Sequence, residues 1–432
     1  MNKKGFTLVE LLAVLLVLVI ILIIAVPRVI NAIEESRKEA LRISGENLVD
    51  AIRIKSVSDS SSTIEDKIYI IEDGEFVGNS ISIGGELPDN GTITVYQNGN
   101  TSIAVSKEDY CIRKYIDEEY VSVSKDPNCT IEEPTLESCF TREVDGLGIR
   151  IIAYDNSCPK DVVIPRVLDS LPVRTIGSVS FYDLQLTSVS IPNTVTTLED
   201  STFSENLLTS ITIPSSITSM ATNAFSWNQI TSVTLEDGLT TLGDWALQGN
   251  QLTSVFIPNS ITSMGESVFA ENQLTSIVLE EGSTTIGDYA FAFNLLTNVT
   301  IPSSMENIGF AAFTLNQLTS VTIPSKVTSM GEWAFSENQL TNITIEEGVT
   351  EISGGAFDTN LLESLTIPSS VTYIGEFAFT INELKSISIP EGVSLDNYSI
   401  STTFYDSYVT SNSSSAGTYT SIDQWETWTK QS

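Results

Sequence analysis

The sequence contains no histidine and few basic residues. Of its 432 residues, 21 are Lys or Arg and 55 are Asp or Glu, so the formal net charge is −34. A chain this acidic repels a phosphate backbone, which excludes nucleic acid as a partner held by direct charge attraction. Without histidine there is no Ser-His-Asp or Cys-His nucleophile and no imidazole metal ligand. We therefore expect a protein that is not an enzyme, with no cofactor and no metal site.

Charge is also missing from one long stretch near the amino terminus. Residues 11–26 are uncharged and almost wholly aliphatic, with Lys3 and Lys4 before them and Pro27 after them. This run predicts a membrane segment, and the preceding lysines keep the amino terminus in the cytoplasm. No small-residue cleavage motif follows the run, so a plain anchor is one interpretation. Against it stands Glu10, because an isolated carboxylate at the edge of hydrocarbon needs a partner.

The residues around Glu10 carry a resemblance. Residues 3–12, Lys-Lys-Gly-Phe-Thr-Leu-Val-Glu-Leu-Leu, are similar to the leader junction of the type IV pilin and pseudopilin family. The resemblance implies that a prepilin peptidase cuts after Gly5, that Phe6 becomes the methylated first residue, and that Glu10 meets the terminal amine of a neighbouring subunit. Pro27 stands where pilin helices commonly carry a kinking proline. The resemblance also implies a leader at residues 1–5 and a membrane and assembly helix at residues 6–57.

Beyond Pro27 the pattern changes from uniformly apolar to amphipathic. Ile33, Leu41, Leu48 and Ile52 fall on one helical face, so the helix is expected to run to about residue 55. Short alternating runs at 67–71, 92–96 and 102–105 then predict strands separated by Gly-containing and Asn-containing turns. The expected fold of this part is α+β, with a small antiparallel pilin-like sheet at 58–135 resting on the helix.

The chain has only four cysteines, Cys111, Cys129, Cys139 and Cys158. They include no C-x-x-C pair, which disfavours a zinc site. An even number outside the membrane permits disulfides, with three possible connectivities. We favour Cys111–Cys129 and Cys139–Cys158 because each pair lies within one predicted unit, and four free thiols remain the alternative.

From residue 191 onward the chain repeats with a period of 22. One aliphatic residue per period marks the repeat: Ile191, Ile213, Leu235, Ile257, Leu279, Ile301, Ile323, Ile345, Ile367 and Ile389. Each ends a Leu-x-x-Val-x-Ile pattern in which the aliphatic positions point inward and the residues between them point outward. This predicts a leucine-rich-repeat β-solenoid with terminal caps over residues 136–432.

Two further positions of the repeat support the solenoid. Twelve residues after each marker lies an aromatic column, interrupted once: Phe203, Phe225, Leu247, Phe269, Phe291, Phe313, Phe335, Phe357 and Phe379. Fifteen residues after each marker lies an unbroken amide column: Asn206, Asn228, Asn250, Asn272, Asn294, Asn316, Asn338, Asn360 and Asn382. We interpret the asparagines as a ladder that satisfies backbone groups in each turn, with sugar binding as the alternative.

The residue pattern of the repeats resembles that of the BspA-like class of leucine-rich repeats on bacterial surface proteins. Asn-Gln-Leu-Thr-Ser-Val-Thr-Ile-Pro and Ile-Gly-Glu-x-Ala-Phe segments carry the resemblance, which covers about residues 139–432. It implies an entry segment at 139–165 and a terminal cap that contains Gly417, Trp425 and Trp428. The first repeat, from Ile164 to Ile191, is longer than the others, as expected of a terminal repeat.

The outward strand positions form a face of hydroxyl side chains, which needs no ligand to explain it. Phe256 and Val278 are the exception, and with Ser254 and Ser276 they are the candidate ligand-face residues. Acidic pairs follow three of the markers at 236–237, 280–281 and 346–347, and we expect them to be solvated turns. A further set of acids falls on three consecutive turns and leaves a weak cation site open: Asp244, Glu266 and Asp288.

Together these patterns predict a minor pilin-like subunit that displays a leucine-rich-repeat domain for adhesion. Its partners would be other pilin subunits, the prepilin peptidase, the membrane before assembly, and a surface protein or glycan. We expect it in the cell membrane before assembly and in an extracellular filament or on the cell surface afterwards. One alternative is a pseudopilin of a type II secretion or DNA-uptake machine. Another is a membrane-anchored surface protein that never polymerises.

Overall fold

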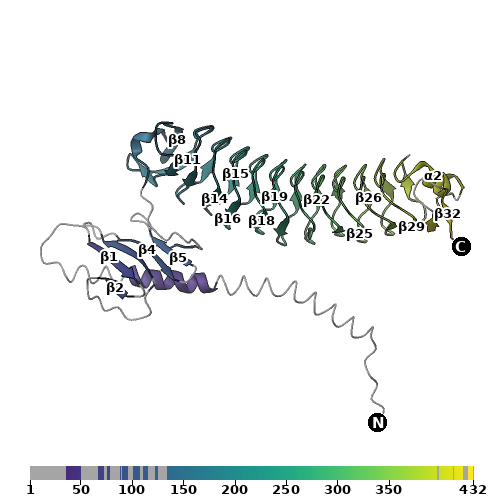
Figure 1. Cartoon of the computed structure of the whole chain (residues 1–432), viewed down its shortest axis with the longest axis horizontal. Helices are drawn as coiled ribbons and strands as arrows, with labels where there is room; N and C mark the ends of the chain where they lie inside the picture. The colour runs from purple at the N-terminus through teal and green to yellow at the C-terminus, as the bar shows by residue number, and fades with distance from the viewer. Residues whose placement is uncertain are drawn as a thin grey trace, which may run out of the picture. The chain divides into compact units, whose positions relative to one another are not determined.

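The structure, a computed structural model, describes most of the chain beyond residue 133 and parts of the chain before it. The described residues are 36–49, 67–72, 75–77, 88, 90–95, 101–107, 110–114, 122–124, 134–396, 398–411, 413–421 and 427–431. The chain divides into two compact units, Met1–Glu133 and Pro134–Ser432. Each unit is described by itself below, and both are drawn in Figure 1.

The first unit contains a helix at 36–49 and an antiparallel sheet. The strands lie in the order β2-β1-β3-β4-β5-β6. Their bounds are β1 Lys67–Glu72, β2 Glu75–Val77, β3 Asn90–Val95, β4 Thr101–Lys107, β5 Tyr110–Lys114 and β6 Ser122–Ser124. The strands predicted at 67–71, 92–96 and 102–105 are therefore confirmed as β1, β3 and β4, within one or two residues at their ends.

The helix of the first unit packs on this sheet through the predicted apolar face. Leu48 and Val49 join a buried cluster with strand residues that include Ile93 and Ile103, and Leu41 packs against its edge. Ile33 and Ile52 lie outside the described residues, as does the predicted membrane segment at 11–26. Among the described residues, no helix has the length and apolar character needed to cross a membrane.

The second unit begins with a cap of short elements. They are the 3-10 helix η1 Glu137–Cys139, β7 Phe140–Asp145, β8 Gly148–Tyr154, β9 Asp161–Val163, β10 Val167–Leu168 and β11 Leu171–Ile176. Strands β7 and β8 form an antiparallel hairpin, and β11 adds to β8 in parallel. The predicted disulfide Cys139–Cys158 is present and closes this cap. Cys111 is also disulfide-bonded, and Cys129 lies outside the described residues.

The remainder of the second unit is a β-solenoid of about 11 turns with a period of roughly 22 residues. One row of strands comprises β12 Ser188–Ser190, β14 Ser210–Ile213, β16 Ser232–Leu235, β18 Ser254–Ile257, β20 Ser276–Leu279, β23 Ser320–Ile323, β25 Asn342–Ile345, β27 Ser364–Thr366 and β29 Ser386–Ile389. A second row of two-residue strands comprises β13 Thr197–Leu198, β15 Ser219–Met220, β17 Thr241–Leu242, β19 Ser263–Met264, β21 Thr285–Ile286, β22 Asn307–Ile308, β24 Ser329–Met330, β26 Glu351–Ile352, β28 Tyr373–Ile374 and β30 Ser394–Leu395.

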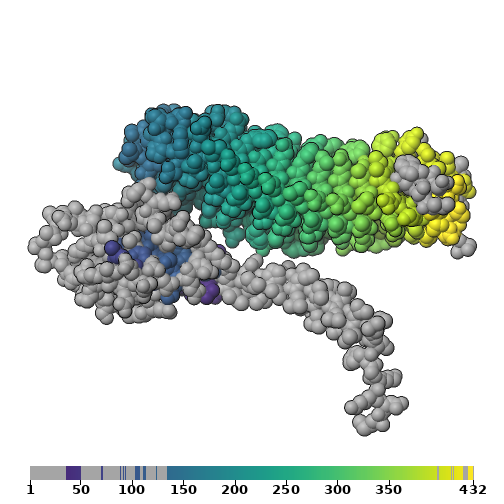
Figure 2. All heavy atoms as spheres, in the orientation of Figure 1, coloured from purple at the N-terminus to yellow at the C-terminus, as the bar shows by residue number. Residues whose placement is uncertain are grey.

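The turns stack in parallel, with residues one period apart placed side by side. Ser210 pairs with Ser232 and Ile213 with Leu235, as the 22-residue repeat requires. Figure 1 shows the strands of successive turns following one another along the solenoid, and Figure 2 shows the turns packed into a continuous body. A solenoid built this way buries its hydrophobic residues mainly against the neighbouring turns.

The predicted aromatic column is the centre of the solenoid core. From Phe269 to Phe379 the rings stack with centroids 5.2–5.6 Å apart and interplanar angles of 6–12°. All of these rings are fully buried, and Leu247 fills the same position in the turn between Phe225 and Phe269. The repeat unit thus contributes one large side chain per turn to an uninterrupted core.

The asparagine column has the structural role predicted for it. The Asn294 Nδ2 amide donates to the carbonyl oxygens of Phe269, Phe291 and Ala292, at 2.9–3.2 Å. Its Oδ1 atom accepts the backbone N–H of Leu274 at 3.0 Å. The same pattern recurs at the other asparagines of the column, which are buried. The side chain therefore satisfies backbone groups in adjacent turns, as buried polar groups require.

A terminal cap closes the carboxyl end of the solenoid. Its elements are helix α2 Thr402–Tyr405, the π-helical segment η2 Asp406–Ser411, β31 Gly417–Thr420 and β32 Thr429–Lys430. Strand β31 pairs antiparallel with β29 and so covers the last edge of the strand row. Tyr419 and Trp428, which belong to the predicted terminal cap, are buried here, and Trp425 lies outside the described residues.

Candidate binding face of the repeat domain

The longer strands present one continuous surface, which we call the strand face. In β14, Ile211 and Ile213 are buried whereas Ser210 and Thr212 are exposed. The same alternation holds in β18 and β23. The inward and outward positions predicted from the Leu-x-x-Val-x-Ile pattern are therefore confirmed. The strand face consists mainly of serine and threonine hydroxyls.

The strands of this face pair two by two. β14 pairs with β16, β18 with β20 and β23 with β25. In each pair the second strand is followed by glutamate, whose backbone N–H donates to the preceding turn: Glu236 to Ile213 O, Glu280 to Ile257 O and Glu346 to Ile323 O, at 3.0–3.2 Å. Where proline follows the marker residue instead, as Pro302 follows Ile301, that donor is missing. Glutamate thus extends the ladder in these three pairs, whereas β27 pairs with β29 although Pro390 follows β29.

The acidic pairs after these strands do more than face solvent. The Glu236, Glu280 and Glu346 carboxylates each accept a backbone N–H from the preceding turn, at 2.9–3.1 Å. Glu347 accepts the backbone N–H groups of Ser369 and Ser370 in the next turn, at 3.0 and 3.1 Å. These bonds, with those from the serine hydroxyls, hold the pKa of Glu347 below its usual range. The sequence pattern did not reveal this capping role.

Phe256 and Val278 interrupt the hydroxyl surface. They are 45% and 53% exposed and face each other directly across β18 and β20. Ser254 and Ser276 form the neighbouring exposed pair in the same strands. The structure therefore brings the four ligand-face candidates together as one patch of two apolar and two hydroxyl side chains.

A hollow of about 490 Å³ lies on the strand face in the turns that follow this patch. Asn298, Thr300, Ser320, Thr322, Asn342 and Thr344 line it, with Glu281 and Glu346 also among its lining residues. Residues 298–301 form no strand, and the turn that follows them begins with Pro302. The sequence pattern did not predict this hollow, although asparagine replaces the usual outward serine at 298 and 342. The hollow offers hydroxyl and amide groups, and it has no basic side chain.

The acids on consecutive turns do not converge on a cation. Asp244 Oδ1 accepts the Glu266 backbone N–H at 2.8 Å, and Asp288 Oδ1 accepts the Phe310 backbone N–H at 2.7 Å. Within the described ranges, no group of three or more Cys, Asp or Glu side chains is arranged to hold a metal ion. Asp244 and Asp288 instead tie each turn to the next.

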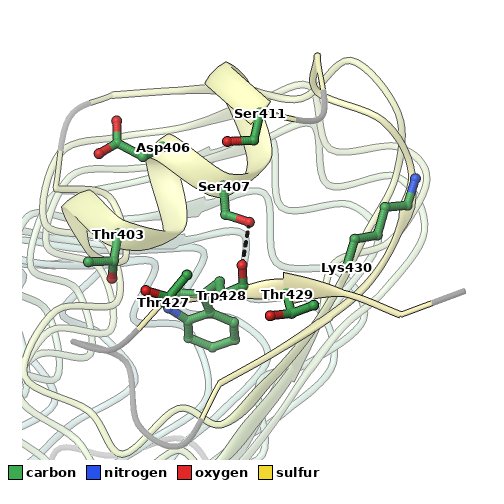
Figure 3. A pocket seen from close by; sticks show the side chains of 8 residues that line it. All are labelled: Thr403, Asp406, Ser407, Ser411, Thr427, Trp428, Thr429 and Lys430. Carbon is green, nitrogen blue, oxygen red and sulfur yellow. Dashed lines mark hydrogen bonds between the residues drawn. The ribbon is translucent and has the colours of Figure 1, made fainter.

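The terminal cap contains a second hollow, of about 410 Å³ (Figure 3). The Ser407 hydroxyl donates to the Trp428 carbonyl at 2.8 Å and links η2 to the segment before β32. Lys430 points away from this contact in Figure 3, and its Nζ atom donates to Ser415 Oγ at 2.8 Å. The polar groups seen here hold the cap together.

The residues predicted for processing and assembly are not among the described ones. Gly5, Phe6, Glu10 and Pro27 all precede residue 36, where the described residues begin, so the structure places none of them. Their roles rest on the amino-terminal sequence.

The stacked parallel turns, with one buried asparagine per turn, define a leucine-rich-repeat solenoid. A sequence model of the BspA type leucine rich repeat region matches residues 174–296 and 284–410, in six copies. This is more than half of the chain, which therefore belongs to the BspA-type leucine-rich-repeat family. A second model, of the prokaryotic N-terminal methylation motif, matches residues 1–26. No curated protein matches the chain.

Several solved structures are similar to the repeat domain. A leucine-rich repeat protein from Bacteroides ovatus is 20% identical, with 59% of this chain and 65% of that chain covered and a TM-score of 0.44. One from Eubacterium ventriosum is 22% identical, with 40% and 51% covered and a TM-score of 0.31. A leucine rich cell surface protein from Faecalibacterium prausnitzii is 22% identical, with 61% and 90% covered and a TM-score of 0.35. The chain thus spans less than two thirds of the first two structures.

Proposed function

We propose that this protein is a minor subunit of a type IV pilus-like filament and displays its repeat domain as an adhesive. The observation that carries the proposal is the union of two matches in one chain: a methylation motif at residues 1–26 and BspA-type repeats at 174–410. The first implies processing by a peptidase and assembly with other pilins. The second supplies a long exposed surface for ligands.

The first unit supplies the pilin-like part of this proposal. Its helix at 36–49 packs on an antiparallel sheet through Leu48 and Val49, which suits a subunit whose helix continues from a membrane segment into a filament core. In this scheme the chain is held in the cell membrane before assembly, with its amino terminus in the cytoplasm. Afterwards it lies in an extracellular filament or on the cell surface.

The size of the repeat domain favours a rare subunit. The second unit, Pro134–Ser432, would have to fit beside every subunit if the chain formed the whole filament. A position at or near the filament tip avoids that crowding. The same position presents the strand face to whatever the cell approaches.

The strand face is the proposed ligand surface. Phe256 and Val278 offer exposed apolar contact beside a hollow lined with amide and hydroxyl groups. Binding sites combine apolar area with a few polar groups that set orientation. A surface protein or glycan is the class of ligand that this patch would take.

Glu10→Ala tests assembly. The substitution leaves a buried terminal amine without its countercharge, at a cost of about 3–5 kcal/mol, so incorporation into filaments should fall. Glu35→Ala is the matched control, since it removes an acid beyond the apolar run. The measurement is the amount of each variant in sheared surface filaments relative to the membrane fraction. Equal incorporation of Glu10→Ala and the unmodified chain would contradict the proposal and favour the non-polymerising anchor.

A further inference from the structure

Two positions of each regular solenoid turn have a left-handed backbone, and the first of them carries an aromatic side chain in several turns. This first position lies ten residues after the marker in the regular turns, and its φ angle is 50–67° at Ser201, Asn223, Trp245, Ser267, Tyr289, Ala311, Trp333, Gly355, Phe377 and Tyr398. This conformation costs an L-residue about 1–2 kcal/mol and is uncommon for bulky side chains. Glycine, asparagine or serine suffices at several turns. The aromatic residues are therefore not required by the backbone.

From Trp245 to Phe377 the aromatic residues in this column occur at every second turn, and Tyr398 adds one more in the turn directly after Phe377. Trp245, Tyr289, Trp333 and Phe377 are each 44 residues apart, and the turns between them carry Ser267, Ala311 and Gly355. These three small residues are buried. A Cβ atom on Gly355 would lie 2.5–2.8 Å from three ring atoms of Trp333, so the indole lies flat over that glycine. The aromatic side chains themselves remain partly exposed, Phe377 to 38%.

An acidic residue precedes each of these aromatic residues. The pairs are Asp244-Trp245, Asp288-Tyr289, Glu332-Trp333 and Glu376-Phe377, which we call the acid–aromatic column. Backbone hydrogen bonds from the following turn fix the Asp244 and Asp288 carboxylates in place. Between residues 175 and 384 the sequence contains one basic residue, Lys326. The column thus offers flat apolar surfaces and hydrogen-bond acceptors, in a region that repels anions.

The spacing of the column selects among ligands. Adjacent turns are 5.2–5.6 Å apart, measured between the stacked core rings. Two turns therefore separate successive aromatic residues by roughly 10–11 Å. This matches the length of one disaccharide unit in an extended β-1,4-linked chain of hexopyranoses. In such a chain, C–H faces can stack on aromatic rings while equatorial hydroxyls donate to carboxylates.

We propose that the acid–aromatic column binds a neutral β-1,4-linked glycan that runs along the solenoid axis, with one disaccharide for every two turns. The column lies about half a repeat away from the strand face in sequence. The inference therefore goes beyond the proposed function and does not depend on pilus assembly or on Phe256. Covering the small residues of the next turn is the competing explanation for the aromatic rings.

A pull-down with insoluble polysaccharides tests this inference. The full chain, kept in solution with detergent, is incubated with microcrystalline cellulose, with chitin and with a β-1,3-glucan. We expect retention on cellulose or chitin, and the two arms show which sugar is preferred. The β-1,3-glucan has a different repeat and should retain at least tenfold less protein.

Matched variants separate ligand contact from covering. Trp333→Ala should raise the dissociation constant at least tenfold. Trp227→Ala is the control because Trp227 also has a left-handed backbone, is 50% exposed and lies over a glycine, Gly249, but stands outside the column. Glu332→Gln keeps the side-chain shape and should weaken binding several-fold without changing the unfolding midpoint. This variant keeps the test decisive if Trp333→Ala fails to fold.

Three results would overturn the inference. The first is failure of the unmodified chain to bind either β-1,4-linked glycan. The second is equal retention on the β-1,3-glucan. The third is equal loss of binding in Trp227→Ala and Trp333→Ala, which would leave covering as the function of both rings. None of these results bears on filament incorporation, so the proposed function is tested separately.

Discussion

Replacing Phe313 by alanine should destabilise the repeat domain more than any change on its surface. The Phe313 ring is fully buried and stacks at 5.3 Å on Phe291 and at 5.2 Å on Phe335. Alanine leaves a cavity that neither ring can fill without breaking the register of the turns. The expected loss is about 3–5 kcal/mol, which combines lost burial with the cavity itself.

The aromatic column itself suggests a milder substitution at position 313. Leu247 occupies the equivalent position two turns before Phe291 and is equally buried, so the fold accepts leucine there. Phe313→Leu should therefore cost less than about 1.5 kcal/mol. The surface control is Phe256→Ser on the strand face, which should change stability by less than about 0.5 kcal/mol.

The assay is denaturant unfolding of fragment 134–432, which contains its own buried core. Because each turn contacts mainly its neighbours, the loss of stability in Phe313→Ala should affect the central turns first. The order of stability should be Phe256→Ser, then Phe313→Leu, then Phe313→Ala. If Phe256→Ser is as destabilising as Phe313→Ala, the inward and outward assignment of the strand is wrong and the proposed ligand face is lost with it.

Three further changes test the polar parts of the fold. Asn316→Ala removes donors to Phe291 and Phe313 and the acceptor for the Leu296 N–H, so unfolding should require about 3 kcal/mol less, whereas exposed Asn298→Ala should be neutral. Asp237→Glu should raise the unfolding free energy by about 1 kcal/mol, because the longer side chain brings a carboxylate toward Ser260 as Glu281 does toward Ser304, and the buried Ser260 Oγ has no partner among the described residues. An unchanged midpoint would contradict this. The pKa of Glu347 is lower in the folded chain than in the unfolded chain, where it is about 4.3. Glu347 therefore stabilises the fold fully above the unfolded pKa, and this stabilisation is lost as the pH falls through the folded pKa. Glu347→Gln should therefore flatten the acid limb of the unfolding midpoint below about pH 5, and an unchanged limb would refute the cap.

The periodic positions were predictable because each repeats one physical requirement. Phe291 must be large and apolar to fill the core, and Asn294 must supply two donors and an acceptor to the backbone of adjacent turns. The inward and outward alternation of β14 follows from strand geometry alone. Phe256 and Val278 stood out because they break that alternation on an otherwise polar surface.

Features that depend on neighbouring turns were harder to predict. The Glu347 carboxylate caps Ser369 and Ser370, residues that become its neighbours only once the turns stack. The N–H bonds of Glu236, Glu280 and Glu346 extend the strand pairs only once neighbouring turns are stacked. The hollow beside Asn298 lies where a turn forms no strand. The position of Trp333 over Gly355 depends on a left-handed backbone that no side-chain pattern reveals.

The central claim is that one chain joins a processed pilin amino terminus to a BspA-type repeat domain. Its most direct test is the intact mass and amino-terminal sequence of the protein recovered from sheared surface filaments. We predict a chain that starts at Phe6, carries a methyl group on its terminal amine and extends through the repeat domain. An uncut Met1, a start beyond Val26, or absence of the chain from the filament fraction would contradict the claim.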